Sequence, residues 1–134
     1  EETYESIKHV NEYGNEFWYA RELQRVLEYT QWPRFADANE RAKLACSNSG
    51  YSASEHFADA GKSSPMPHGG VRILEDYMLS RYACYLIVMN GDPRKEVIAV
   101  GQTYFAVKTR QQELIDHYDE LSEDQKRLAM RKEL

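Results

Sequence analysis

The chain has 134 residues, a length that suits one domain with a core of ordinary size. It carries 17 Lys and Arg residues against 22 Asp and Glu residues, so its formal net charge at pH 7 is −5. Because phosphate neutralisation dominates the binding of nucleic acids, this acidity argues against wholesale attraction to DNA, although it leaves room for a local basic patch.

The N-terminal third predicts a β-hairpin followed by two helices. Residues 7–10 and 17–19 are strand-prone and flank a turn near Gly14. Helical periodicity begins at residue 20 and runs to 29, and a second helix should extend from about 32 to an Asn-Ser-Gly stop at 48–50. The pair resembles a helix-turn-helix in outline, but two helices that simply pack together fit the pattern as well.

The middle of the chain, residues 52–67, is rich in Ser, Gly and Pro, and we expect a connecting loop that tolerates disorder. Residues 56–59, within this stretch, and residues 71–74, after it, are strand-prone. The segment Gly61-Lys62-Ser63 lacks the upstream glycine spacing of a phosphate-binding loop, so that interpretation is rejected.

Two more helices should meet at Asn90-Gly91-Asp92-Pro93, where Asn-Gly ends one helix and Asp-Pro starts the next. The first, residues 77–89, follows the acidic pair Glu75-Asp76 and is apolar around much of its circumference, which predicts a buried central helix. The second runs to about residue 118 and has two apolar stripes. One stripe contains Val97, Val100, Tyr104, Val107, Gln111, Leu114 and Tyr118, and the other contains Ile98 and Phe105.

A helix with two apolar faces should have core on one side and something else on the other. We therefore expect a homodimer contact through the long helix, residues 93–118, resting on the stripe of Ile98 and Phe105. A further helix should start at Leu121-Ser122. Together the elements predict an α+β, mostly helical domain over residues 1–134, with a small hairpin-based sheet packed on a helical core and long C-terminal helices. The last helix has no stop signal, which suggests an N-terminal fragment of a longer chain.

Basic residues are the main candidates for binding a nucleic acid or an acidic partner, and they fall on both helical pairs. Trp32, at a helix entry, should be partly exposed and could stack on unpaired bases, whereas Trp18 should pack in the core. The competing interpretation is a set of solvated helix faces paired with neighbouring carboxylates. The basic candidates are Arg21, Arg25, Arg34, Arg41, Lys43, Arg94, Lys95, Lys108 and Arg110. Arg81, in a very apolar segment, needs a carboxylate partner, for which Asp76, Asp92 or Glu96 could serve.

Catalytic and metal-binding motifs are not evident. Cys46 and Cys84 lie far apart among apolar neighbours, which predicts buried, reduced thiols. The histidines share no ligand spacing, so we expect no metal, no cofactor and no enzyme. No apolar run approaches the roughly 18 residues of a membrane span, and no signal peptide is visible, so a cytoplasmic location fits.

Three stretches carry a family resemblance: EFWYARELQRVLEYTQWPRF, RAKLACSNSGYSASEHF and SRYACYLIVMNGDPRKEVIAVGQTYFAVKTRQQE. In order, spacing and residue choice they resemble the bacterial DNA-damage-inducible protein D family, which is related to the N-terminal domains of phage antirepressors and of baculovirus repeated-ORF (BRO) proteins. The resemblance covers roughly residues 7–134. The segment Ser64–Gly70 departs from the family pattern and looks like a variable connecting loop.

The resemblance implies a bacterial, non-enzymatic protein of the DNA-damage (SOS) response that modulates recombinational repair through recombinase filaments on single-stranded DNA. The link to antirepressors implies the alternative, a DNA-binding or repressor-binding transcriptional regulator. A filament modulator should bind naked duplex poorly, whereas a regulator should bind duplex directly and with a steep salt dependence.

Overall fold

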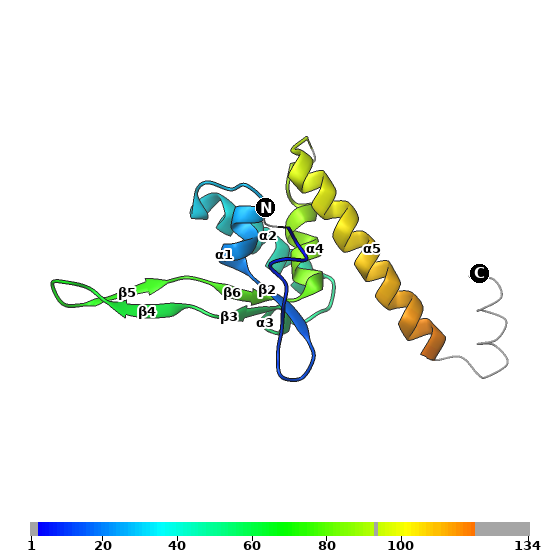
Figure 1. Ribbon diagram of the computed structural model, residues 1–134, viewed down its shortest axis with the longest axis horizontal. Coiled ribbons are helices and arrows are strands. Elements are labelled where there is room, and N and C mark those ends of the chain that lie inside the picture. Colours follow the sequence, from blue (N-terminus) through cyan, green and yellow to red (C-terminus); the bar gives the residue numbers. More distant parts are fainter. Residues whose placement is uncertain (1–2, 93, 120–134) are drawn as a thin grey trace.

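The computed structural model describes residues 3–92 and 94–119. Figure 1 shows a body of helices above a small sheet, with a hairpin reaching out on one side and a long helix on the other. This arrangement confirms the predicted α+β, mostly helical fold. The elements are β1 (His9–Val10), β2 (Glu16–Tyr19), α1 (Ala20–Val26), α2 (Trp32–Asn48), α3 (Ala53–His56), β3 (Phe57–Asp59), β4 (Lys62–Pro65), β5 (Val71–Leu74), β6 (Tyr77–Leu79), α4 (Arg81–Met89) and α5 (Glu96–Asp119). The helix expected from residue 121 lies outside the described residues.

The main sheet has four antiparallel strands in the order β1-β2-β6-β3. The predicted hairpin joins β1 to β2, and Gly14 in its turn has φ +81°, a conformation that favours glycine. In the register of the sheet, Leu79 lies opposite Trp18 on one side and opposite Phe57 on the other. All three side chains are buried, so the centre of this sheet forms one wall of the core.

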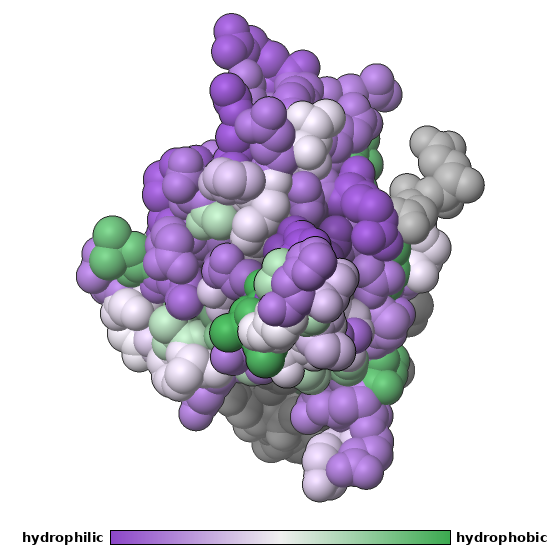
Figure 2. All heavy atoms as spheres, turned by 90° about the vertical axis from the view of Figure 1, so that its left-hand side faces the viewer, coloured by the Kyte–Doolittle hydropathy of each residue, from purple (hydrophilic) through white to green (hydrophobic). Residues whose placement is uncertain are grey.

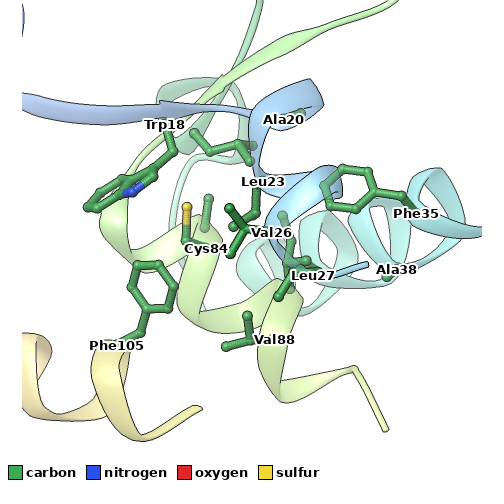
Figure 3. Packing of buried hydrophobic residues seen from close by; sticks show 14 of the residues in the cluster. Trp18, Ala20, Leu23, Val26, Leu27, Phe35, Ala38, Cys84, Val88 and Phe105 are labelled. Atoms are coloured by element: carbon green, nitrogen blue, oxygen red, sulfur yellow. The ribbon is translucent and has the colours of Figure 1, made fainter. Parts of the chain in front are cut away.

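The core lies between the sheet and the helices α1, α2, α4 and α5. Trp18 is fully buried, its indole N–H donates to the carbonyl of Tyr4 at 2.9 Å, and its ring meets Phe105 edge-on at 5.4 Å. Figure 3 shows Cys84 of α4 beside these two rings. Cys46 and Cys84 are both free and buried, and burial raises the pKa of each thiol. The predictions for Trp18 and for both cysteines are therefore confirmed.

The prediction of a helix over residues 77–89 was wrong for its first turn. Residues 77–79 form β6, because Leu79 is held between two strands of the sheet. The helix begins only after Ser80, whose Oγ accepts from the N–H of Ala83 at 3.0 Å as an N-cap. Asp76 serves a different helix: its Oδ1 accepts from the N–H of Arg21 at 3.0 Å and so caps the first turn of α1.

The loop expected over residues 52–67 was also wrong on both sides of the short strand within it, because residues 53–56 form α3 and residues 62–65 form β4. β4 and β5 pair antiparallel along their whole length, from Lys62 opposite Leu74 to Pro65 opposite Val71. The turn between them is closed by Gly69 and Gly70, both with φ near +84°. We call residues 62–74 the arm, and Figure 1 shows it reaching away from the body.

The structure reverses the roles predicted for the two apolar stripes of α5: the stripe expected to form a dimer contact lies in the core. Ile98 and Phe105 are 1% and 0% exposed and belong to the core, so they cannot form a dimer contact. The exposed apolar residues of the helix come mainly from the other stripe, namely Val100, Val107 and Leu114. The reason is the N-terminal segment, where Tyr4 packs edge-on against Phe105.

Candidate nucleic-acid and partner-binding surface

Glu75, at the base of the arm, organises the residues around it. Its carboxylate accepts from the Trp32 indole N–H at 3.1 Å and from the Tyr77 hydroxyl at 2.5 Å. These hydrogen bonds hold the pKa of Glu75 below its ordinary value, and the bond from Tyr77 has the larger effect. Arg21 donates to the Glu75 carbonyl at 2.8 Å and stacks its guanidinium on Trp32, 3.8 Å from the ring centroid. One face of Trp32 is therefore covered by an arginine.

Lys43 extends this cluster along α2. Its ammonium lies 5.2 Å from the ring centroid of Tyr77 and 3.6 Å from the carboxylate of Glu40. Lys43 and Lys62 both line a hollow of about 560 Å³ between α2 and the arm. Three of the predicted site residues, Arg21, Trp32 and Lys43, are thus brought together at the base of the arm.

Three other predicted arginines, Arg25, Arg34 and Arg41, are exposed on α1 and α2. Arg41 borders a shallow groove on α2 together with Leu44, which is 63% exposed. Arg34 and Arg41 make no ion pair among the described residues. They extend the polar surface of α2, and Lys43 connects that surface to the arm.

The corner between α4 and α5 holds Arg94 and Lys95. Arg94 is bound by Asp92 through contacts of 2.8–3.1 Å, and the hydrogen bonds from Arg94 lower the pKa of Asp92 to about 2. The ammonium of Lys95 lies 5.0 Å from the ring centroid of Tyr29, which follows α1. Asp92 caps a turn before α5, which begins at Glu96, and Pro93 lies outside the described residues.

Lys108 and Arg110 lie on α5, and each meets a carboxylate. Lys108 is 3.5 Å from Glu5 and 5.8 Å from the ring centroid of Tyr104, and Arg110 is 3.3 Å from Glu113. Figure 1 places α5 and the arm on opposite sides of the body. The predicted basic residues therefore occupy three separate places: the surface of α1, α2 and the arm base, the α4–α5 corner, and α5.

A second polar cluster lies at the start of α4. Arg81 does find a carboxylate, but it is Glu16 on β2, at 2.7 Å, and none of the three acids considered from the sequence. Ser80 Oγ and His56 Nδ1 are 2.6 Å apart, a contact that was not predicted from the sequence. Ser80 also caps α4, and among the described residues no carboxylate contacts the other ring nitrogen of His56. The pair thus ties α3 to α4.

The arm carries residues that sequence reasoning missed, and the register assigns them to two faces. Paired residues share a face, so Lys62, Ser64 and Arg72 lie on one face and Val71 and Ile73 on the other. Ile73 is 75% exposed and Val71 is 65% exposed. Figure 2, which looks along the arm from its tip, shows an apolar patch on it within a mostly hydrophilic surface. The feature of the sequence that could have indicated the arm is the Gly69-Gly70 pair between two four-residue segments, 62–65 and 71–74.

The described part of the chain has no cluster of three or more His, Cys, Asp or Glu side chains that could hold a metal ion. No helix within residues 3–92 and 94–119 combines the length and the hydropathy needed to cross a membrane.

The comparisons with known proteins agree with the resemblance noted in the sequence. The chain is 48% identical over 133 residues to DNA damage-inducible protein D of Escherichia coli (strain K12), and the alignment covers 98% of this chain and 48% of that protein. The chain thus spans about half the length of this curated relative. No solved structure matches it. Residues 6–106 match the model of the BRO family, N-terminal domain, and the chain therefore belongs to the BRO family.

Proposed function

We propose that this chain is a non-catalytic module of the bacterial response to DNA damage, and that it acts on recombinase filaments assembled on single-stranded DNA. The printed name of its relative, DNA damage-inducible protein D, supports the first half of the proposal. The match to a BRO family domain supports a regulatory rather than a catalytic role. The distribution of cations over the surface supports the second half.

The observation that carries the proposal is that four of the nine basic candidates are already paired with a carboxylate. Lys43, Arg94, Lys108 and Arg110 each lie within 4 Å of a carboxylate, and the candidates are spread over three places. A cation that is paired within the protein gains less by meeting a phosphate, and the net charge of −5 opposes close approach to DNA. Binding to naked DNA should therefore be weak, and a protein that coats the DNA should supply the remaining affinity.

The test is fluorescence-anisotropy binding to labelled single-stranded and duplex DNA, with and without a bacterial recombinase, over a salt series. We expect a clear signal on recombinase-coated strands at about 150 mM salt, and little binding to naked duplex at the same salt. Tight binding to naked duplex, with a salt slope typical of six or more phosphate contacts, would contradict the filament proposal.

That opposite outcome would favour the second candidate function, a DNA-binding regulator of the antirepressor type. The observation in its favour is the exposure of Arg25, Arg34 and Arg41 on α1 and α2, the pair with a helix-turn-helix outline. If this pair reads DNA, Arg34→Gln should weaken duplex binding and Arg94→Gln should not, because Arg94 lies outside α1 and α2 and is held by Asp92.

A further inference from the structure

The arm differs from the rest of the chain in charge. Residues 60–74 contain Lys62 and Arg72 but no Asp or Glu, although acidic residues outnumber basic ones in the chain as a whole. The acids that flank the arm are both engaged at its base. Asp59 accepts from the N–H of Gly61 at 2.8 Å, and Glu75 accepts from Trp32 and Tyr77. The arm is therefore a cationic element on an acidic protein.

Both cations lie on one face and are available. Lys62 and Arg72 lie opposite Leu74 and Ser64 in the register, so these four residues share a face. Neither cation makes an ion pair with any described residue, and both are exposed. This availability contrasts with Arg94, Lys108 and Arg110, which are held by carboxylates.

The tip of the arm carries apolar side chains next to His68. Met66 is 49% exposed and is followed by Pro67, and the turn closes with Gly69 and Gly70. A two-stranded ribbon has the width of a DNA groove, and exposed Met or Pro side chains at such positions can wedge between base steps. Cations along the ribbon and apolar side chains at its tip together match the chemistry of a nucleic acid, with phosphates outside and bases inside.

The base of the arm is fixed to the body, so its direction is set. The N–H of Ala60 donates to the carbonyl of Asp76 at 2.9 Å, and Asp76 also caps α1. Glu75 links the base to Trp32 of α2, as described above. The arm is therefore a continuation of the β3–β6 hairpin that is braced against α1 and α2.

We infer that the arm is a nucleic-acid-binding ribbon, whose Lys62–Arg72 face contacts phosphates and whose Met66-Pro67 tip lies against bases. The inference deepens the proposed function, on which it rests for the presence of DNA in the complex. Two phosphate contacts give little affinity alone, which agrees with the need for a recombinase to hold the module in place.

The experiment measures binding to labelled 30-mers without recombinase, at low salt where weak binding is measurable. One set of 30-mers is single-stranded and the other is duplex. Lys62→Gln with Arg72→Gln should reduce the slope of log K against log salt by about 1.4 on single strands or about 1.8 on duplex. A loss of slope on only one of the two substrates identifies the form of DNA that the arm contacts. An unchanged slope and affinity on both would overturn the inference.

A matched pair of variants separates a phosphate contact from damage to the fold. Ser63 and Ser64 are adjacent, exposed and on opposite faces of β4. Ser64→Glu places a carboxylate between the two cations and should weaken DNA binding about tenfold at low salt, whereas Ser63→Glu should have a clearly smaller effect. Equal effects of the two variants would contradict the assignment of faces.

A last pair of variants tests the alternative partner, a protein. Val71→Thr with Ile73→Thr keeps β-branched side chains but removes the apolar face of the arm. If that variant abolished binding to recombinase-coated strands while Lys62→Gln with Arg72→Gln left it intact, the arm would be a protein contact and the inference would fail. That result would not contradict the proposed function. The proposed function would be contradicted if the unaltered chain did not bind recombinase-coated strands.

Discussion

Glu75 shows how one exposed carboxylate can position a whole element. It contacts Trp32 of α2 and Tyr77 of β6, and its own backbone carbonyl accepts from Arg21 of α1. Because the arm ends next to Glu75, these hydrogen bonds determine the direction in which the arm leaves the body. The residue is thus a positioning residue for the arm.

Acid should weaken this junction, and the sign follows from the pKa. Hydrogen bonds from Tyr77 and Trp32 lower the pKa of Glu75 from its ordinary value of 4.5. The carboxylate therefore stabilises the fold at higher pH, and that contribution is lost as the pH falls through the folded-state pKa. We expect Glu75→Gln to lose less stability than the unaltered chain between about pH 5 and about pH 3 in urea unfolding.

The control is Glu12→Gln, because Glu12 is exposed in the first turn and bonds to no described residue. Its acid-dependent loss of stability should equal that of the unaltered chain. If Glu75→Gln also showed the same loss, the hydrogen bonds to Glu75 would not contribute to stability.

Arg81 shows the limit of sequence reasoning for single residues. The need for a carboxylate partner could be predicted, since an unpaired charge in an apolar segment is costly. The partner, Glu16, lies 65 residues earlier in the chain and faces Arg81 only because β2 and α4 pack together. The nearer acids are used elsewhere: Asp76 caps α1, and Asp92 binds Arg94.

Helix α5 packs against the N-terminal segment through a close approach at Gly101. A Cβ at this position would lie 2.3 Å from Tyr4 Oη and 2.8 Å from Tyr4 Cζ. Tyr4 cannot easily move, because its hydroxyl donates to the carbonyl of Val97 at 2.6 Å and its ring stacks on Tyr104. The glycine is therefore required by packing, although its backbone is helical.

Gly101→Ala should destabilise the protein by about 1–3 kcal/mol, through overpacking against Tyr4. Helix propensity alone predicts the opposite sign, a gain of about 1 kcal/mol. Chemical denaturation measures the difference directly. Thr103→Ala, at an exposed position of the same helix, is the control and should be close to neutral. A more stable Gly101→Ala variant would show that the N-terminal segment does not pack against α5.

The strand β6 was misread because its residues suit either element. Tyr77, Met78 and Leu79 are apolar and continuous with the α4 pattern, so periodicity favoured one long helix. The decision depends on pairing with β2 and β3, which are distant in sequence. Ser80 marks the true start of the helix, and as a typical N-cap residue it was the available local signal.

The two sides of the body differ in the surfaces that they expose. On the side opposite the arm, Val100, Val107 and Leu114 of α5 lie seven residues apart and are 37–53% exposed. In the sequence the same spacing continues to Leu121 and Leu128, as in a coiled coil. The homodimer through the long helix therefore stays a prediction, with this stripe replacing Ile98 and Phe105.

Light scattering over a range of protein concentrations tests the dimer. The unaltered chain should approach twice its monomer mass, and Val107→Asp should remain at the monomer mass, because it places a charge in the centre of the stripe. Ala106→Asp adds the same charge on a neighbouring exposed face and should still dimerise. A monomeric mass for the unaltered chain at every concentration would exclude this contact.

The family, the α+β composition, the first hairpin, the bounds of α2 and the burial of Trp18 and both cysteines could all be read from the sequence. These features depend on local periodicity, turn residues and side-chain hydrophobicity, which act over a few residues. The separation of the basic residues, the pairing of Arg81 with Glu16 and the core side of α5 could not be read in this way. They depend on which distant segments meet, and the packing of β6 and of the Tyr4 segment determines that.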